Sequence, residues 1–401
     1  MNRETSYAFI VDYYLGILSN KVYGITMFLF FMLGVLYPRL IKYSDLVPSF
    51  LLYISGGTGT RKTTTSTLLL NPFDFETGSF EDTLTSCVEL FRQTPLGCFI
   101  LDDLKRADYE AMQILNKILR LAGDATTQCR KMCGGKVLEQ NISALCVVTG
   151  EIELHLQESS MARLLILPYD ENTVNLNVLK YLQANKNKLC TSLVCVIQRF
   201  IQDKKIIEDL CNLVICMRGT LAEKFKNDRI HGRYIDMMSW LMAIYDIICK
   251  YFAEENIKIN FDYKKELQSL IFQQHLTYNN ETISMFSKCL FELYNSNALI
   301  ICTESEFSTG NHKPDIVDYD SEWFISSGTV FRKIKSYAES IGLYINFSEK
   351  KLRSELSNAE ILQQRNQKNT YELRKGNNRC SGFYIRKNLL MKYLENELGG
   401  I

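Results

Sequence analysis

The stretch Pro48-Ser-Phe-Leu-Leu-Tyr-Ile-Ser-Gly-Gly-Thr-Gly-Thr-Arg-Lys-Thr63 decides the fold of this chain. It is a short apolar run that ends in a glycine cluster and leads into a segment of helical character. A buried strand, a glycine-rich turn and a helix, in this order, are typical of a phosphate-binding loop. The glycines let the backbone curl so that its N–H groups point at phosphate oxygens, and the helix adds its positive N-terminal end.

The loop nearly fits the pattern G-x-x-x-x-G-K-[ST]. We expect Lys62 to reach the β- and γ-phosphates and the Thr63 hydroxyl to lie on Mg²⁺. Arg61 stands where the pattern has its second glycine, and a positive φ there would strain an arginine by about 1 kcal/mol. An ordinary turn before a helix is the alternative. The predicted nucleotide contacts are Gly56, Gly57, Thr58, Gly59, Thr60, Arg61, Lys62, Thr63 and Thr64.

An acidic strand end follows the loop. Cys98-Phe-Ile-Leu-Asp102-Asp103 is an apolar run ending in two carboxylates, which is the Walker B arrangement. We expect Asp102 to hold Mg²⁺ through water and Asp103 to orient the attacking water. Asp103 takes the place usually held by Glu, and its shorter arm favours slower hydrolysis. The two motifs together predict ATP and Mg²⁺ as cofactors, with Thr63 and Asp102 at the metal.

Strands and helices alternate in the first part of the chain. Ala144–Val148 and Leu164–Leu167 are further apolar runs, and Ala107–Leu121 has a helical pattern. This alternation predicts a parallel, three-layer α/β sheet. From about Val174 the pattern is helical only, and Thr303–Ser321 has the polar composition of a linker. We therefore predict N-terminal helices (1–47), a P-loop core (48–173), a helical lid (174–302), a linker (303–321) and a small basic domain (322–401).

Composition narrows the class of protein. The chain has 401 residues with 46% hydrophobic content, which is enough for two or three domains. Its net charge of +1 predicts no partner, but Trp323–Ile401 carries 14 Lys and Arg against 7 Asp and Glu, a balance of +7. A basic terminal domain predicts a polyanion contact, with a solvated basic face as the alternative. The 13 cysteines, without zinc spacing or a secretion signal, favour reduced thiols in a cytoplasm.

One uncharged segment needs separate treatment. Val22–Pro38 is rich in Phe, Leu and Met, but it is shorter than the roughly 20 apolar residues that span a bilayer. Gly24 and Gly34 dilute it, and no signal-peptide cleavage pattern follows. We expect a buried helix under the sheet and no membrane contact, with a membrane anchor as the alternative.

The order of the motifs resembles a known family. After the acidic strand come Val148-Thr-Gly-Glu151 and then Ser159-Ser-Met-Ala-Arg163-Leu-Leu-Ile-Leu-Pro168. This succession resembles the AAA+ helicase-like ATPases of integrative mobile elements, which are similar to MCM replicative helicases. The resemblance extends over roughly residues 20–250 and implies an AAA+ core with a helical lid.

The resemblance implies roles for three more residues. Thr149 matches the sensor-1 position, a polar side chain at a strand tip that contacts the γ-phosphate or its water. Arg163 matches the arginine finger, which in this family reaches the neighbouring subunit's nucleotide and offsets charge there. A surface arginine capping a strand edge is the alternative for Arg163. Arg233 matches the second sensor arginine of the lid, with Arg218 and Arg229 as competitors.

A basic hairpin is predicted between the acidic strand and Thr149. In Arg130-Lys-Met-Cys-Gly-Gly-Lys136-Val-Leu, two short runs flank a Gly-Gly turn. In helicases of this family a hairpin at this place projects into the central pore and grips the DNA backbone. Lys131 and Lys136 suit that role, since phosphate contact needs exposed positive charge. An ordinary surface hairpin is the alternative.

The C-terminal domain has the pattern helix, helix, hairpin. Thr329–Ile341 and Glu349–Arg365 have helical patterns, and two strands around a Gly-Asn turn follow between Thr370 and Arg386. This order is that of a winged helix, which places its second helix in a groove and its wing on phosphates. A protein–protein module of the same shape is the alternative. The predicted DNA contacts here are Lys350, Lys351, Arg353, Arg374, Lys375 and Arg379.

These parts predict ATP-driven translocation on single-stranded or forked DNA by a ring, a homohexamer. The ring follows from Arg163 acting in trans. Because the ATPase begins almost at Met1, we expect primase or initiator activity on a separate chain. Arg61 and Asp103 favour the alternative of a nucleotide-switched DNA-binding or assembly protein that does not unwind. A third possibility is a degenerate ATPase that keeps only the fold.

Overall fold

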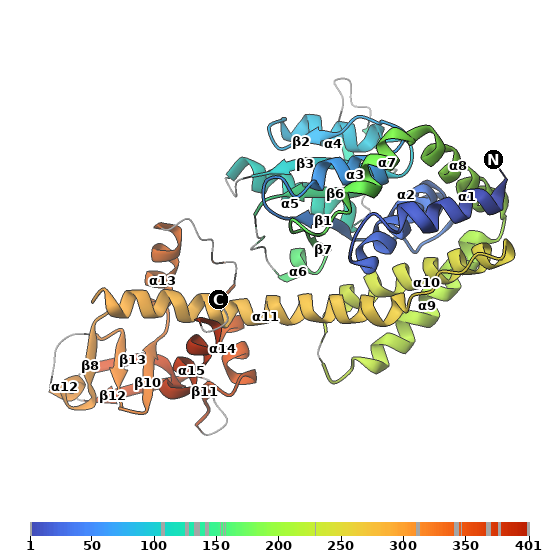
Figure 1. The fold of residues 1–401 in the computed structure, drawn as a ribbon. Helices are drawn as coiled ribbons and strands as arrows, with labels where there is room; N and C mark the ends of the chain where they lie inside the picture. The colour runs from blue at the N-terminus through green and yellow to red at the C-terminus, as the bar shows by residue number, and fades with distance from the viewer. Residues whose placement is uncertain are drawn as a thin grey trace. The chain divides into compact units, whose positions relative to one another are not determined.

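The chain forms two compact units, shown in Figure 1. The first comprises residues 1–154 and 159–274, and the second comprises residues 155–158 and 275–401. The structure is a computed structural model that describes residues 2–105, 109–124, 128–131, 137–140, 144–152, 154, 156, 158–228, 230–309, 313–340, 345, 347–365, 370–375 and 378–398.

A five-stranded parallel sheet lies at the centre of the first unit, in the order β2-β3-β6-β1-β7. Its strands are β1 (Leu51–Ser55), β2 (Gly78–Ser79), β3 (Cys98–Leu104), β6 (Leu145–Gly150) and β7 (Leu164–Pro168). The middle strands are almost wholly buried, as expected of a parallel sheet covered on both faces. The parallel α/β sheet predicted from the alternation is confirmed.

Helices cover both faces of this sheet. Successive residues of a strand point to opposite faces. On β3, the Phe99 ring stacks on Phe91 at 5.2 Å, whereas the neighbouring Cys98 thiol lies 3.9 Å from the Phe30 carbonyl oxygen. One face is therefore covered by α4 (Leu84–Gln93) and the other by α2 (Lys21–Tyr43), giving three layers. The remaining helices next to the sheet are α3 (Lys62–Leu70), α5 (Tyr109–Asp124) and the short α6 (Glu158–Met161).

Helix α2 contains the uncharged segment Val22–Pro38. It is long and apolar enough to cross a membrane by length and composition, yet 83% of its most apolar window is buried inside the protein. Pro38 has no N–H to donate to Gly34, and the Gly97 N–H donates to the Gly34 carbonyl instead, at 3.2 Å. A Cβ on Gly34 would lie 2.3 Å from the Gly97 oxygen, so only glycine permits this contact. The helix is a core element of the first unit.

The predicted N-terminal helices are separate elements before and after residues 15–20. The chain before α2 forms α1 (Arg3–Phe9) and the π-helical turn η1 (Ile10–Tyr14), and Asn20 then caps a new helix by accepting from the Val22 N–H. Ser, Thr, Asp and Asn side chains favour such N-caps, which explains where α2 begins.

The predicted all-helical region follows β7. Its helices are α7 (Leu176–Ala184), α8 (Lys186–Gln202), α9 (Ile206–Lys224), α10 (Gly232–Glu254) and α11 (Tyr263–Asn295). The boundary between the two units falls within α11, after Gln274. Between α5 and β6, β4 (Gln128–Lys131) pairs with β5 (Val137–Gln140) in an antiparallel hairpin. The Gly-Gly turn and Lys136 lie outside the described residues.

The second unit has a six-stranded sheet in the order β11-β13-β10-β9-β8, with β12 also paired to β13. Its strands are β8 (Ile301–Thr303), β9 (Ile316–Asp318), β10 (Glu322–Ser326), β11 (Leu362–Gln363), β12 (Tyr371–Lys375) and β13 (Asn378–Arg386). Its helices are α12 (Glu304–Thr309), α13 (Thr329–Ser340), α14 (Glu349–Asn358) and α15 (Lys387–Leu398), beside the second half of α11.

Two sequence predictions for this region are wrong. Residues 303–321 are not a linker, because they include α12 and β9, and β9 pairs with both β8 and β10. Ile316 and Val317 are fully buried, and Lys333 donates to the buried Asp315 at 2.7 Å. A three-residue strand among polar residues gives too little periodicity to be seen in the sequence.

The predicted second helix also ends early. It stops at Asn358, because Glu360 adopts a left-handed conformation with φ 58° and the Ile361 N–H donates back to the Leu356 carbonyl at 2.9 Å. This is the C-terminal closure that Gly usually provides. The chain then forms β11 before the predicted hairpin of β12 and β13.

Candidate functional site

Three oxygen-bearing side chains meet at the carboxyl edge of the parallel sheet. Thr63 begins α3 just after β1, Asp102 lies near the end of β3, and Thr149 lies near the end of β6. The Thr63 hydroxyl donates to Asp102 Oδ1 at 2.9 Å, and the Thr149 hydroxyl donates to the same oxygen. Parallel strands present their carboxyl ends at one edge, which is where ligands bind in open α/β sheets. The structure therefore brings these three predicted residues together.

The loop between β1 and α3 curls around the Lys62 ammonium group. Lys62 Nζ donates to the carbonyl oxygens of Gly56 at 2.5 Å and Gly57 at 2.8 Å. Thr60 is buried and its hydroxyl donates to the Gly57 carbonyl at 2.9 Å. Gly57 and Gly59 face open space, since a Cβ on either would have nothing within 4 Å. The loop is thus closed underneath by Lys62 and open on its outer side.

Arg61 occupies the position at which the sequence raised the question of strain. It has φ 64° and ψ 23°, which is the left-handed conformation, and it is the N-cap of α3. For most L-residues this left-handed conformation costs about 1–2 kcal/mol, and Gly, Asn and Asp are the residues that tolerate it. The position does have a positive φ, which is the condition under which the sequence predicts strain at Arg61.

Asp103 leaves the strand ladder next to Asp102. Its φ is 71°, and the pairing of β3 with β6 shifts register between Leu101 and Leu104. The Asp103 N–H donates to the Thr149 hydroxyl oxygen at 3.2 Å, so one hydroxyl links both acidic residues. The Asp103 carboxylate forms an ion pair with Lys105 and raises the pKa of that lysine. The two neighbouring carboxylates therefore have different partners, Thr63 and Thr149 for Asp102 and Lys105 for Asp103.

Sequence reasoning did not assign two residues at this edge. Glu151 accepts a hydrogen bond from the Thr58 hydroxyl at 2.7 Å and so ties the phosphate loop to the end of β6. Its position in Val148-Thr-Gly-Glu151 was the available signal. Lys105, the partner of Asp103, carried no motif signal at all.

Arg163 and Arg233 lie together at the opposite edge of the sheet. The Leu51 N–H at the start of β1 donates to the Arg163 carbonyl, which places Arg163 at the amino edge. At about 3.3 Å per residue, the length of β1 puts roughly 15 Å between this edge and the phosphate loop. Arg163, only 8% exposed, donates through Nη1 to the Ser159 carbonyl at 3.1 Å, and Arg233 donates to the same oxygen at 2.6 Å. Neither arginine therefore belongs to the Thr63–Asp102 cluster of its own chain.

The competitors of Arg233 are placed differently. Arg218 forms an ion pair with Asp236 at 2.6 Å, within the helical region. Arg229 lies outside the described residues. Arg233 shares the Ser159 carbonyl with Arg163 as a hydrogen-bond acceptor, whereas the contact of Arg218 is with Asp236.

The predicted DNA contacts of the second unit are largely tied to carboxylates or neighbouring groups. Arg374 and Arg379 both bind Glu372, and these contacts hold the Glu372 pKa below its usual value. Arg353 lies 3.7 Å from Glu349 and donates to the Thr370 hydroxyl. Lys350 is exposed, and Lys351 is half-buried.

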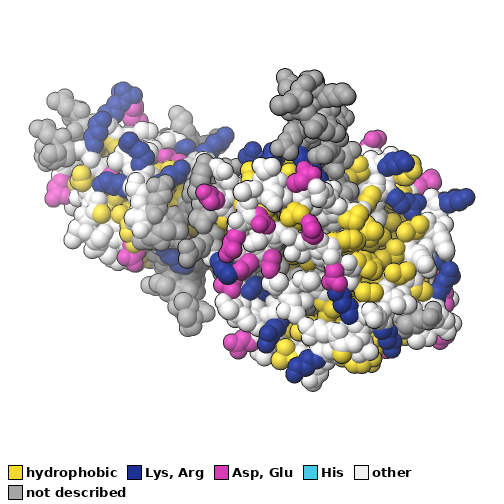
Figure 2. All heavy atoms as spheres, turned by 90° about the horizontal axis from the view of Figure 1, so that it is seen from above, with side chains coloured by type: hydrophobic (Ala, Val, Ile, Leu, Met, Phe, Trp, Pro, Cys, Tyr) yellow, Lys and Arg dark blue, Asp and Glu magenta, His cyan; other side chains and the backbone are white. Residues whose placement is uncertain are grey.

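The surface drawn in Figure 2 likewise shows Lys and Arg interspersed with Asp and Glu. For two further predicted DNA contacts, the structure describes the backbone but not the side chain. These are Lys131, at the end of β4, and Lys375, at the end of β12. The free positive charge of the second unit is thus smaller than its composition suggests.

The residues at the carboxyl edge fit a nucleotide with Mg²⁺. A hydroxyl and a carboxylate, Thr63 and Asp102, are the hard oxygen ligands that Mg²⁺ prefers. The first-turn N–H groups of α3 have no acceptor inside the helix, and the exposed loop residues leave room above them. The donor set and the open loop thus fit a phosphate group.

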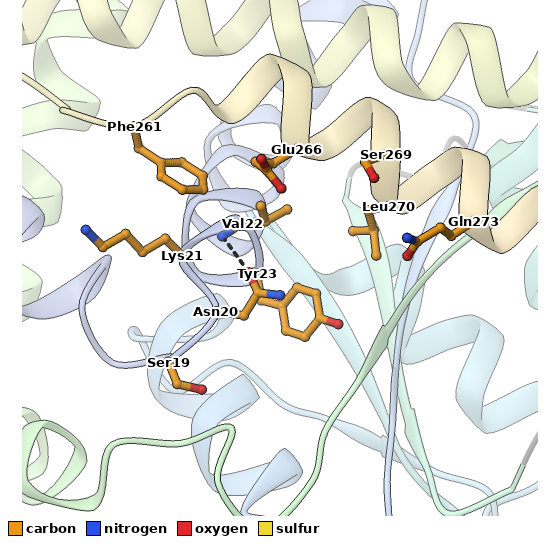
Figure 3. Close-up of a pocket in the computed structure, with 10 residues that line it drawn as sticks. All are labelled: Ser19, Asn20, Lys21, Val22, Tyr23, Phe261, Glu266, Ser269, Leu270 and Gln273. Carbon is orange, nitrogen blue, oxygen red and sulfur yellow. Dashed lines mark hydrogen bonds between the residues drawn. The ribbon is translucent and has the colours of Figure 1, made fainter. Parts of the chain in front are cut away.

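A separate hollow of about 580 Å³ lies between the start of α2 and the first half of α11 (Figure 3). Lys21, Tyr23, Phe261, Glu266 and Gln273 are among its lining residues, and none of the phosphate-loop residues takes part. Its chemistry is mixed and its mouth is wide, so it does not extend the site at the sheet edge.

Comparisons with known proteins support the fold. No protein-family model and no curated protein matches the chain. Its structure is similar to a solved structure described as "SCCmec type IV Cch - active helicase", with TM-score 0.63 and 11% sequence identity, over 98% of this chain and 72% of that chain. A second match, "The A form apo structure of NrS-1 C terminal region-CTR", has TM-score 0.31 and 12% identity over 92% and 76% of the chains, too weak for any argument. The chain thus has a P-loop-like α/β fold shared with a helicase structure.

Proposed function

We propose that this chain is a P-loop ATPase of the AAA+ kind that uses ATP to move along DNA. The observation that carries the proposal is the meeting of Thr63, Asp102 and Thr149 at the open phosphate loop. The likeness to a structure titled an active helicase supports the DNA-directed half. The role in mobile-element replication rests on the motif order Asp-Asp, Thr-Gly-Glu and Ser-x-Ala-Arg.

Each residue at the sheet edge has a chemical task in this proposal. The loop N–H groups and Lys62 hold phosphate oxygens, which requires Lys62 Nζ to exchange its carbonyl acceptors for phosphate. Thr63 and Asp102 hold Mg²⁺, which neutralises phosphate charge when bound. Asp103 orients the attacking water. The Thr149 hydroxyl links Asp103 to Asp102 by hydrogen bonds to both residues. Arg61 and Thr64 flank Lys62 and Thr63 in the same turn.

A ring is part of the proposal because of where the arginines lie. Arg163 cannot reach the phosphate loop of its own chain from the amino edge, so a catalytic role requires a neighbouring subunit. A homohexamer is the ring we propose, with Arg233 beside Arg163 at the same interface. The helical region serves as the lid, the β4–β5 hairpin grips DNA, and the winged-helix-like second unit adds affinity. We place the protein in the cytoplasm, with a separate primase or initiator chain as partner.

A nucleotide-switched DNA-binding or assembly protein is the second candidate. The strained Arg61 and the Asp103–Lys105 ion pair favour it, because both weaken a hydrolytic site. Steady-state ATP turnover with and without single-stranded DNA separates the two functions. A motor turns over ATP faster with DNA, and Lys62→Ala should abolish this activity. Slow turnover that DNA leaves unchanged would contradict the motor and support the switch.

A further inference from the structure

The second unit contains a cluster of aromatic side chains. It lies on the face of the six-stranded sheet that carries Phe324, Leu373 and Cys380. Around the Tyr384 ring, the centroids of Phe324, Tyr371 and Tyr319 lie at 5.0, 5.4 and 5.9 Å. Gly382 makes the cluster possible, since a Cβ there would lie 2.6 Å from the Phe324 ring.

Arg365 covers this cluster from the solvent side. Its guanidinium carbon lies 3.8 Å from the Tyr384 ring centroid, in a cation–π contact. Its Nη2 donates to Glu322 at 2.5 Å, and its backbone N–H and carbonyl both bond to the Tyr371 hydroxyl. Tyr384 is only 7% exposed, whereas 45% of the Arg365 side chain remains exposed. The guanidinium plane is therefore held in place from below, from its edge and through its backbone.

One face of this guanidinium lies on the Tyr384 ring, and 45% of the side chain remains exposed. Arginine binds phosphate through the N–H groups in its plane, and Glu322 already occupies part of that edge. The flat face of a guanidinium stacks on aromatic rings and on nucleic-acid bases. An arginine backed by Tyr384 and anchored by Glu322 loses little rotamer freedom on stacking, which favours binding.

We propose that Arg365, supported by Tyr384, is a stacking site for one unpaired base of a single-stranded nucleic acid. The proposal rests on the proposed function, because it assumes that the chain engages nucleic acid. It adds a contact with a base of the strand. The contacts predicted for Lys350, Arg374 and Arg379 are with the phosphate backbone. It also favours single strands, since bases in a duplex are already stacked.

The test compares two probes of the same length on the full chain. Fluorescence anisotropy at one fixed salt concentration measures the affinity for a dT oligonucleotide and for an abasic oligonucleotide with the same phosphates. One stacked base is worth about 1–3 kcal/mol, so wild type should bind the dT strand about 5-fold to 150-fold more tightly. Arg365→Lys keeps the charge but loses the plane, so this preference should fall several-fold while abasic affinity stays within about 2-fold. Tyr384→Phe keeps the ring and should keep the preference.

Arg386→Lys is the matched control. Arg386 is an exposed arginine on β13, two residues after Tyr384, and its side chain donates to Gln363 at 2.7 Å. It should leave the preference for dT unchanged. An unchanged preference in Arg365→Lys overturns this inference alone, provided that wild type binds DNA. Equal loss of abasic and dT binding in Arg365→Lys overturns base stacking in favour of a backbone contact. Absence of any DNA binding by wild type overturns the proposed function as well.

Discussion

The two units differ in how their sheets create a site. In the first unit all strands run in parallel, so β1, β3 and β6 deliver Thr63, Asp102 and Thr149 to one edge. In the second unit most neighbouring strands are antiparallel, and its arginines are spread over helix, strand and hairpin beside carboxylates. A parallel sheet concentrates chemistry at one place, whereas the second unit distributes charge over a surface. The first suits a reaction and the second suits binding.

The largest effect that would sharpen this comparison concerns Arg163. Arg163→Ala should spare ATP binding but lower ATP turnover by about 10³-fold, the effect typical of arginine fingers. Because Arg163 is buried against Ser159, a thermal melt must accompany the assay. A turnover loss with an unchanged melting temperature supports catalysis. Loss of both supports the alternative, a structural arginine.

Mixing Arg163→Ala with Asp103→Asn chains tests whether the finger acts in trans. If Arg163 serves its neighbour, some interfaces of a mixed ring contain one intact site and activity partly returns. No recovery at any ratio, with mixed assembly confirmed, would contradict the ring part of the proposal.

The next effect contrasts the hairpin of the first unit with the wing of the second. Lys131→Ala with Lys136→Ala should remove DNA stimulation of ATP turnover at saturating DNA, with modest loss of affinity. Arg374→Ala with Arg379→Ala should do the reverse, and flatten the slope of log affinity against log salt by about 1.5 if both contact phosphates. Lys226→Ala, at an exposed lysine of the first unit, should change neither. Loss of stimulation in the wing variant alone would mean that the coupling element lies in the second unit.

The pairing of both wing arginines with Glu372 refines that contrast. Because Glu372 already pairs with both side chains, we expect the slope to flatten by less than about 1.5. Removing the chain from about Ser321 onward would not test the β12–β13 hairpin alone. The sheet already includes β8 and β9, so a cut near Ser321 would separate paired strands.

The sequence predicted the first unit better than the second for a physical reason. The strand, loop and helix around Lys62 are contiguous in the chain, so a short stretch of sequence predicts them. The positive φ of Asp103 could not be predicted in this way, because it depends on a register shift against β6. Likewise, the shared contact of Arg163 and Arg233 with Ser159 joins residues distant in sequence. In the second unit, β9 is only three residues long and α14 ends at a left-handed Glu360, and neither leaves a clear periodic signal.

A smaller effect tests the strain at the phosphate loop. Arg61→Gly should raise the free energy of unfolding by about 1 kcal/mol, because Gly adopts φ 64° without the penalty of an L side chain. Urea denaturation of both chains measures the difference. Asn256→Gly is the control, since Asn256 has φ 60° and Asn tolerates this conformation. A gain at Asn256 equal to that at Arg61 would contradict local strain at the loop.

The central claim is that the carboxyl edge of the parallel sheet binds ATP through Lys62, Thr63 and Asp102. Calorimetric titration of ATP with Mg²⁺ into wild type, Lys62→Ala and Lys226→Ala tests it most directly. Removing one partner of a buried charge pair costs about 2–5 kcal/mol, so Lys62→Ala should bind ATP roughly 30-fold more weakly or worse. Lys226→Ala should bind as wild type does. Equal ATP affinity in wild type and Lys62→Ala would contradict the account.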